Sequence, residues 1–274
     1  MAWIAHREQG LLYHTSTVQG VGVSHAFTTR VGGVSPAPYD SLNLRFSCDD
    51  DAENVRQNYE RLFAVLGMDA ARAVASHQLH HDNIRIVTEA DAGSGIALDR
   101  TFTDTDALLT ATENLPLVVY SADCGITLLH DPVHRAVGAV HSGWRGVALD
   151  ILGKTVTAMQ AAFGTDPQDL RVAVGAGIRA CCFETDDDVS DALCETYGDA
   201  FLPYRTRVGN KWHIDLAGLC RHSLAKRGIP CAQIDILPDC TCCRRDLYWS
   251  HRRDGNARGV QAAVIQLNAR RDAE

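Results

Sequence analysis

Residues 105–147 read TDALLTATENLPLVVYSADCGITLLHDPVHRAVGAVHSGWRGV and contain three short apolar runs bounded by turn residues. The runs occupy residues 117–122, 126–129 and 136–140. Their content of Val, Ile and Leu predicts strands of a buried sheet. Asp131-Pro132 predicts a tight turn between the second and third runs, and residues 123–125 are expected to form the first turn. The three strands would then form a meander, with Cys124 and His141 at the same edge of the sheet.

A thiol and an imidazole at one sheet edge are candidates for a metal site or a nucleophile–base pair. Residues 76–82, SHQLHHD, add three histidines between two apolar segments. Cys124, His141 and one of His77, His80 and His81 would make a three-ligand set suited to Zn²⁺, with a fourth position left to water. Spacing along the chain does not decide between this set and unrelated groups in a core.

The same residues permit two other kinds of chemistry. In a cysteine hydrolase, Cys124 would attack the substrate and His141 would act as the base. Asp123 is not expected to orient His141, because neighbouring residues of a strand point to opposite faces. One cysteine and two histidines can also form a blue-copper site. Copper is nevertheless a poor match to a reduced, cysteine-rich chain that has no H-x-H pair.

Length and composition describe an ordinary globular chain. At 274 residues it can bury one large core, so we expect a single domain over residues 1–274. The net charge of −8 argues against nucleic acid or an anionic membrane as a partner. The start of the chain is too short and too polar for a signal peptide, and no apolar run approaches membrane length. We therefore expect a cytoplasmic protein whose ten cysteines are reduced.

Capping residues and glycines mark the expected helices. Asp50 and Glu53 fit a capping box for a helix that Gly67 ends. A second helix is expected from Gly146 to Gly164. Further helices are expected at residues 186–197 and 215–228, and further strands at residues 25–30, 170–174, 233–237, 248–253 and 258–267.

Two arginines lie beside glycines in a way that can serve an anion. Arg30 precedes a Gly-Gly loop, and Arg145 lies at the expected start of a helix, where backbone N–H groups and the helix dipole favour negative charge. Each also has an ordinary interpretation, as a surface residue of a turn or of a common strand–helix connection. A basic run at the end of the chain is open to the same two interpretations.

The clustered cysteines do not fit a zinc ribbon. Cys181 and Cys182 are adjacent, and two adjacent thiols rarely ligate one zinc, so we expect them to be packing residues. Cys240 and Cys243 have C-x-x-C spacing but lack a second such pair, which makes them half a site.

Several segments together resemble the laccase-domain family, also called the polyphenol oxidase, multicopper-oxidase-like or peptidoglycan editing factor family. The motifs are TTRVGGVS (28–35), SLNL (41–44), QLH (78–80), TDA (105–107), ADC (122–124), HSGWRG (141–146), GIRACCFE (177–184) and SHRRDG (250–255). They occur in the order and spacing of that family and cover about residues 25–261. The ADC and HSGWRG pair is the most specific part of the match.

The resemblance implies an α+β fold, a single layered α/β/β/α domain with mixed sheets and outer helices. It implies a zinc site formed by His80, Cys124 and His141, in which His80 is selected because it ends the Gln-x-His motif. The implied activity is that of a purine nucleoside phosphorylase acting on adenosine, inosine, guanosine and methylthioadenosine. Adenosine deamination is a further implied activity.

Phosphorolysis needs an anion site near the ribose and stabilisation of the departing purine. With the resemblance in view, Arg30 and Arg145 are our candidates for phosphate. Asn43 and Gln78, which lie in family motifs, are candidates for substrate contacts. Asp123 is a candidate proton donor to the purine, beside His80, Cys124 and His141 as catalytic residues.

Two other functions remain open. A peptidoglycan-precursor editing amidase or hydrolase could use Cys124 or the zinc site, and a copper polyphenol oxidase is a weaker third choice. Purine nucleosides and phosphate are the expected partners, with no nucleic acid and no membrane. The chain is expected to be a monomer or a small homo-oligomer.

Overall fold

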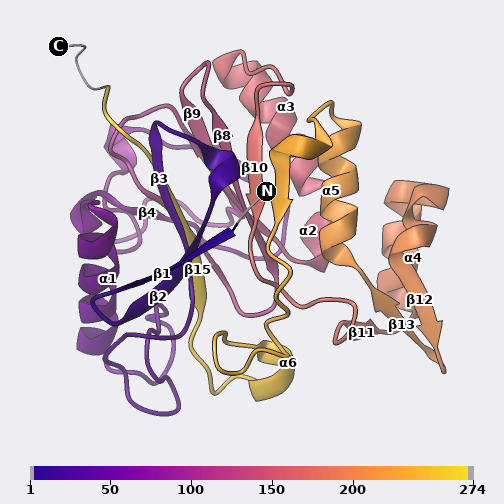
Figure 1. Cartoon of the computed structure of the whole chain (residues 1–274), viewed down its shortest axis with the longest axis horizontal. Helices are drawn as coiled ribbons and strands as arrows, with labels where there is room; N and C mark the ends of the chain where they lie inside the picture. Colours follow the sequence, from indigo (N-terminus) through magenta and orange to yellow (C-terminus); the bar gives the residue numbers. More distant parts are fainter. Residues whose placement is uncertain (1–2, 271–274) are drawn as a thin grey trace.

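The computed structural model describes residues 3–270 and contains two six-stranded sheets and a three-stranded sheet (Figure 1). Residues 1–2 and 271–274, which the single-domain prediction includes, lie outside the described range, as does the beginning of the segment expected to be too polar for a signal peptide. The first sheet has the order β1 (Trp3–Glu8), β2 (Leu11–Ser16), β3 (Val23–Thr28), β15 (Gln261–Leu267), β7 (Leu117–Ser121), β4 (Val74–Ala75). The second has the order β14 (Ile234–Ile236), β10 (Arg171–Val174), β8 (Gly125–Asp131), β9 (Ala136–Ser142), β6 (Ala107–Thr110), β5 (Ile84–Ile86). The small sheet has the order β11 (Glu184–Thr185), β13 (Lys211–Ile214), β12 (Arg205–Val208).

The two large sheets stack face to face and carry helices on their outer faces. Phe27 and Val119 of the first sheet pack with Leu128 and Ala139 of the second to form the central core. The helix α1 (Ala52–Leu66) covers the outside of the first sheet, whereas α3 (Ile151–Phe163) and α5 (Leu216–Lys226) cover the outside of the second (Figure 1). This confirms the predicted α/β/β/α layers. No helix within residues 3–270 is long and apolar enough to cross a membrane.

Both large sheets are mixed, as predicted. The strand β4 runs parallel to β7, β5 to β6 and β10 to β14. The other ladders of these sheets are antiparallel. Each parallel pair joins a short strand at an edge of its sheet to a longer neighbour, so antiparallel pairing dominates the centre of both sheets.

The predicted meander is wrong. The strand β7 belongs to the first sheet, where it pairs with β15 and β4, whereas β8 and β9 form a hairpin in the second sheet. Residues 122–124 therefore carry the chain from one sheet to the other. Short apolar runs do not specify their pairing partners, and the partner β15 lies at the far end of the chain. Cys124 and His141 still meet, because Gly125 is paired with Ser142 and Ile126 with His141.

Three other boundaries differ from the sequence prediction. The N-cap of α1 is Asp51, which accepts the N–H of Glu53, because the Asp50 carboxylate instead binds Ser35 and Asn43. The helix expected from Gly146 is broken at Asp150, which has φ 55° and separates α2 (Trp144–Ala148) from α3. The strand expected at residues 248–253 is wrong: this segment leads into α6 (His251–Asp254), which Ser250 caps.

The remaining helix signals are confirmed. Gly67 ends α1 in the left-handed conformation that glycine adopts without strain. The predicted acidic helix is α4 (Asp187–Tyr197), and Asp215 caps α5 by accepting the N–H of Gly218.

Candidate functional site

The thiol and two imidazoles proposed as metal ligands converge in the folded chain. His80 lies in the loop after β4, Cys124 directly precedes β8, and His141 is the penultimate residue of β9. One potential ligand atom from each lies within 4.8 Å of the other two. Cys124 Sγ is 3.8 Å from His80 Nε2, and the two imidazole rings meet edge to face with centroids 4.9 Å apart.

A buried carboxylate fixes both histidines. Asp106 is fully buried and accepts a hydrogen bond from Nδ1 of His141 at 2.7 Å. It also accepts the backbone N–H groups of Leu79, His80 and His81 at 3.0–3.2 Å, which holds the loop that carries His80. Because Nδ1 of His141 donates its hydrogen bond to Asp106, Nε2 of that ring is left to face the cluster.

The cluster favours a thiolate. Burial alone would raise the pKa of Cys124, but the His141 and His80 rings outweigh it and lower that pKa to about 6. Burial would lower the pKa of His141, but the Cys124 sulfur and Asp106 raise it to about 9. The two shifts reinforce each other and favour a thiolate–imidazolium pair over a neutral thiol and imidazole. The thiolate is the form of cysteine that binds metals, and a histidine binds a metal through a ring nitrogen that carries no proton. A metal ion bound here would therefore replace the proton on Nε2 of His141.

Gly143 leaves the space in which the three side chains meet. A Cβ atom at this position would lie 3.0 Å from Cys124 Sγ and 3.0 Å from Cδ2 of His80. Its φ of −65° is open to any residue, so glycine is needed here for space rather than for backbone conformation. The glycine of the HSGWRG motif therefore belongs to the site.

A cavity of about 810 Å³ opens beside the cluster, and His80 forms part of its wall. Its volume lies within the usual range for small-molecule sites. The wall includes the apolar side chains of Phe46, Ile96 and Leu98 and the guanidinium groups of Arg45, Arg56, Arg100 and Arg258. The combination of apolar and cationic walls suits a ligand that has a flat ring and an anionic group.

Two of these arginines form hydrogen bonds but no ion pair among the described residues: Arg45 donates to the Ser47 hydroxyl and Arg258 to the carbonyl of Gly259. Arg100 donates to the carbonyl groups of Ala75 and Ser76, and Arg56 pairs with Glu53. Within residues 3–270, neither Arg45 nor Arg258 forms an ion pair with a carboxylate. Burial and the positive charge of Arg45 lower the pKa of Arg258. Two mutually repelling cations in a concave wall favour the binding of an anion.

Four of the other residues predicted to contact substrate or phosphate, or to donate a proton, do not line this cavity. Arg145 is exposed and lies over the ring of its neighbour Trp144, outside the cavity wall. Asn43 is fully buried and binds Arg45 and Asp50, so it shapes the loop beneath the cavity. Asp123 accepts the Thr241 hydroxyl at 2.6 Å and the Arg252 N–H at 2.7 Å, so both carboxylate oxygens are engaged outside the cavity.

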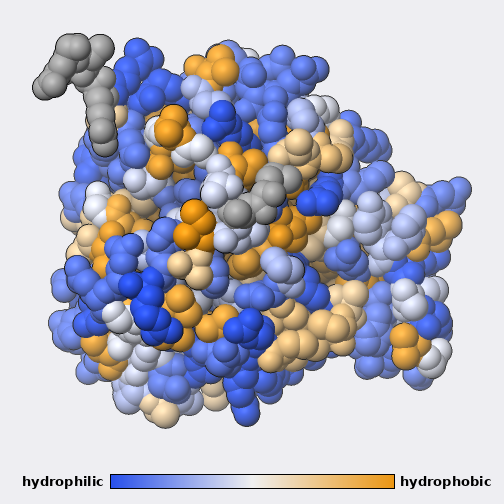
Figure 2. Space-filling view, in the orientation of Figure 1, coloured by the Kyte–Doolittle hydropathy of each residue, from blue (hydrophilic) through white to orange (hydrophobic). Residues whose placement is uncertain are grey.

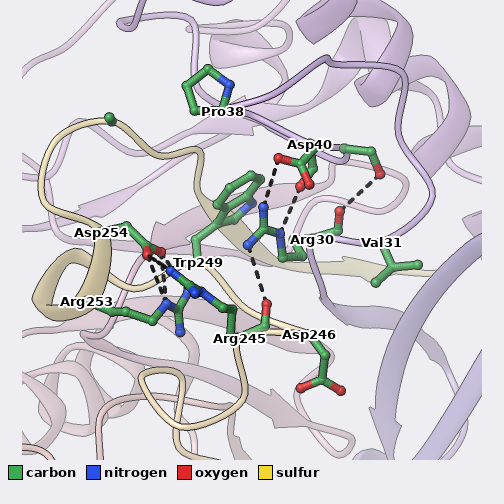
Figure 3. Close-up of a pocket in the computed structure, with 11 residues that line it drawn as sticks. Arg30, Val31, Pro38, Asp40, Arg245, Asp246, Trp249, Arg253 and Asp254 are labelled. Carbon is green, nitrogen blue, oxygen red and sulfur yellow. Dashed lines mark hydrogen bonds and ion pairs between the residues drawn. The ribbon is translucent and has the colours of Figure 1, made fainter.

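Arg30 is the fourth of these residues and lies in a different pocket, of about 760 Å³ (Figure 3). Its guanidinium stacks on Trp249 at 3.9 Å and pairs with Asp40 at 3.2 Å. It also donates to the backbone carbonyls of Asp40 and Arg245. Arg30 therefore joins two loops, with its charge already balanced by a carboxylate.

Gln78 alone among the predicted substrate contacts outside the cluster lines the cavity. Its amide exchanges two hydrogen bonds with the backbone of Tyr120, at 2.7 and 2.8 Å, and so ties the His80 loop to β7. Sequence reasoning missed Asp106, Arg45 and Arg258 as site residues. Asp106 had a signal, because it belongs to the TDA motif, whereas the two arginines lie in segments with no distinctive spacing.

Comparison with known proteins fits this architecture. Residues 24–268 match the family described as multi-copper polyphenol oxidoreductase laccase. The purine nucleoside phosphorylase YlmD of Geobacillus stearothermophilus is 34% identical over 89% of this chain and 90% of its own length. The purine nucleoside phosphorylase YfiH of Escherichia coli is 32% identical over 91% of this chain and 96% of its own length.

A solved structure of a relative has the same fold. The crystal structure of YlmD from Geobacillus stearothermophilus superposes with a TM-score of 0.90 at 33% identity, covering 98% of this chain and all of that one. The names of the relatives support an enzyme of the purine nucleoside phosphorylase kind. The chain therefore belongs to the multi-copper polyphenol oxidoreductase laccase family.

Proposed function

We propose that the chain is a zinc-dependent purine nucleoside phosphorylase that converts adenosine, inosine, guanosine or methylthioadenosine and phosphate into a free base and a ribose 1-phosphate. Adenosine deamination is a second reaction of the same site. The observation that carries the proposal is the cluster of His80, Cys124 and His141 beside a cavity with two arginines that pair with no carboxylate within residues 3–270. The names of the relatives give the substrate class.

The donor set fits Zn²⁺. One thiolate and two imidazoles are ligands that zinc prefers, and three protein ligands leave a position open to water or substrate. The set fits a multicopper centre poorly, because such a centre needs more imidazoles than the two that meet here. Zinc bound here would polarise a purine or lower the pKa of a bound water.

The cavity provides for both substrates. Arg45 and Arg258 would hold phosphate, because charge-assisted hydrogen bonds from guanidinium groups are strong and directional. Phe46 and Leu98, both more than one-third exposed, would cover the faces of a purine. A phosphate oxygen would then form the bond to the anomeric carbon as the bond to the purine nitrogen breaks. The electron pair leaves with the purine, which needs a proton or a positive charge beside it.

Product analysis tests this proposal. We expect zinc-loaded protein and adenosine to give adenine and ribose 1-phosphate only when phosphate is present, as measured by mass spectrometry. The Cys124→Ala variant should lose the reaction. His81→Ala is the matched control, because the His81 side chain pairs with Asp104 rather than with the cluster and the reaction should persist. Absence of phosphate-dependent products from all four nucleosides would contradict the proposal.

The thiolate–imidazolium pair supports a second candidate function. A lowered pKa at Cys124 beside His141 is also the arrangement of a cysteine nucleophile and its base. In that case the chain would hydrolyse amide bonds of peptidoglycan precursors. Metal-stripped protein should then cleave nucleotide-linked muropeptides and be inactivated by thiol reagents, whereas the phosphorylase should regain activity only when zinc is returned.

A further inference from the structure

A second group of sulfur atoms lies outside the candidate active site. Cys181, Cys182, Cys240 and Cys243 place their Sγ atoms within 4.8 Å of one another. The first pair lies in the loop between β10 and β11, and the second pair lies in the loop between β14 and α6. Figure 2 shows a pale orange surface between α6 and β11, where these two loops meet.

The spacing of the sulfur atoms matches a four-thiolate metal site. Cys243 Sγ is 3.6 Å from Cys181 Sγ and 3.4 Å from Cys182 Sγ. Tetrahedral zinc with Zn–S bonds of about 2.3 Å holds its sulfur ligands about 3.8 Å apart. A disulfide requires about 2.05 Å. The four thiols are therefore already close to the separation at which one ion can bind all of them.

The local backbone explains how adjacent cysteines can share one centre. A turn at residues 179–183, in which the N–H groups of Cys182 and Phe183 donate to the carbonyl of Arg179, directs both sulfurs of the pair toward Cys243. The packing role expected for Cys181 and Cys182 rests on the rule that two adjacent thiols rarely ligate one zinc. The turn removes that objection to a shared ligand set.

The other pair has the backbone of a metal-binding turn. Cys240 is buried and its sulfur accepts the N–H of Arg179 at 3.4 Å, while its carbonyl accepts the N–H of Arg244 at 3.0 Å. A backbone N–H group is therefore aimed at the sulfur of this buried cysteine. Backbone groups that stabilise a sulfur anion are what a thiolate ligand requires.

We propose that Cys181, Cys182, Cys240 and Cys243 bind a structural Zn²⁺ as a closed four-thiolate site, separate from the candidate active site. The thiol protons pass to solvent as the ion binds. Cys181 and Cys243 are exposed, so the ion has a route from solvent, whereas Cys240 anchors the site in the interior. Four thiolates satisfy zinc completely, which leaves no position for a substrate.

The two loops that carry these cysteines also contact Asp123, next to the candidate active site. Thr241, between two of the proposed ligands, donates its hydroxyl to the Asp123 carboxylate, and the N–H of Ile178 donates to the Asp123 carbonyl. The loops also form a bridge between Gly177 and Cys240. An ion that fastens the two loops would therefore hold Asp123, and through it the adjacent Cys124.

Alkylation footprinting of the full chain tests the site without a mutation. Protein loaded with Zn²⁺ and protein stripped by a chelator would be treated with iodoacetamide at pH 9, because the raised pKa of the Cys181 thiol, about 11, slows its reaction at neutral pH. Each cysteine would then be followed by mass spectrometry. We expect Cys181 and Cys243 to be protected with zinc and modified without it. Cys231, which is exposed and outside the cluster, is the internal control and should be modified in both samples.

Two outcomes would overturn the proposal. One is equal modification of Cys181 and Cys243 with and without zinc. The other is protection that survives the chelator and disappears only with a reductant, which would identify a disulfide. Either outcome leaves the proposed phosphorylase intact, because that activity depends on the other zinc ligands.

Metal content gives an independent measurement. The Cys181→Ser/Cys243→Ser double variant changes two exposed side chains, so the fold should survive, and circular dichroism checks this. We expect it to lose one equivalent of zinc relative to the unmodified chain, whereas Cys231→Ser should lose none. The loss is expected whether or not the candidate active site retains its own zinc. Unchanged zinc content in the double variant would contradict the proposal.

Discussion

The two sulfur-containing clusters differ in their donor atoms and in whether a cavity lies beside them. At the first, one thiol meets two imidazoles, and His80 opens onto a cavity. At the second, four thiols from two loops face one another. Zinc sites with three mixed ligands keep a position open for chemistry, whereas four thiolates close the coordination shell. Residue type and access together indicate which cluster performs the reaction.

The clusters also differ in how their ligands are held. At the first, a buried carboxylate, Asp106, binds the ring of His141 and the backbone of the His80 loop. At the second, the backbone N–H group of Arg179 donates to the sulfur of Cys240. A carboxylate fixes the tautomer and orientation of an imidazole ligand. A thiolate has no tautomers and needs no such carboxylate. The first cluster should therefore be the more sensitive to changes in residues that are not ligands.

Asp106→Asn should show the largest effect. The amide of Asn keeps one acceptor oxygen and replaces the other by an NH₂ group. That group would face either the N–H groups of Leu79 and His81 or those of His80 and the His141 ring, so the His80 loop loses an acceptor in both orientations. We expect zinc affinity at this site to fall about 100-fold, with a similar loss of activity. Competition with a chromophoric chelator measures the affinity. Protection of Cys181 and Cys243 from alkylation should persist, and equal loss at both clusters would indicate general unfolding instead.

Gly143→Ala should have the next largest effect. The new Cβ would lie 3.0 Å from Cys124 Sγ and from His80 Cδ2, so at least one ligand must move. Displacements of this kind cost roughly 30- to 100-fold in activity. The matched control is Gly146→Ala, because a Cβ there meets no atom closer than 3.4 Å. Similar turnover by the two variants, measured with adenosine and phosphate, would contradict a steric role for Gly143.

The layers of the fold could be predicted, but the pairing of the strands could not. The apolar runs, Gly67 and Asp215 mark strands and helix ends because these signals are local. The route of the chain between the two sheets at residues 122–124 depends on β15, whose residues lie far away in the sequence. No local pattern records that pairing. The predicted meander was wrong for this reason, although the expectation that Cys124 and His141 lie close together is confirmed.

The ligands of the site were easier to predict than the residues that support them. Cys124 and His141 stand out because thiols and imidazoles after apolar runs carry chemistry. Arg258 becomes important only because folding places it beside Arg45 in the same wall. The four-cysteine cluster was missed because sequence spacing cannot show the turn at residues 179–183 that directs two adjacent thiols to one point.

Arg258→Ala should weaken phosphate binding. Its guanidinium faces the cavity beside Arg45 without a carboxylate partner among the described residues, and a lost charge-assisted hydrogen bond costs about 1.5–3 kcal/mol. We expect the KM for phosphate to rise roughly 10- to 30-fold, with a smaller change in the KM for nucleoside. Arg145→Ala is the control, because Arg145 is exposed and outside the cavity wall. A larger rise in the KM for phosphate in Arg145→Ala than in Arg258→Ala would indicate that phosphate binds at the start of α2 instead.

The two clusters should respond differently to pH once metal is removed. His141 and His80 outweigh burial and lower the pKa of Cys124 to about 6, so its thiolate persists at neutral pH and disappears as pH falls below 6. Burial and hydrogen bonds to Cys240 and Cys243 raise the pKa of Cys181 to about 11, so this thiol stays protonated over the same range.

Alkylation of chelator-treated protein should therefore rise roughly tenfold at Cys124 between pH 5 and pH 7 and then level off, because the thiolate is the reactive form. At Cys181 the rate should still be rising at pH 9. Site-resolved mass spectrometry measures both rates in one sample, so differences in reagent or folding cancel. A Cys124 rate that begins to rise only above pH 8 would show that His141 does not stabilise its thiolate, and the chemical contrast between the two clusters would then reduce to their different access to solvent.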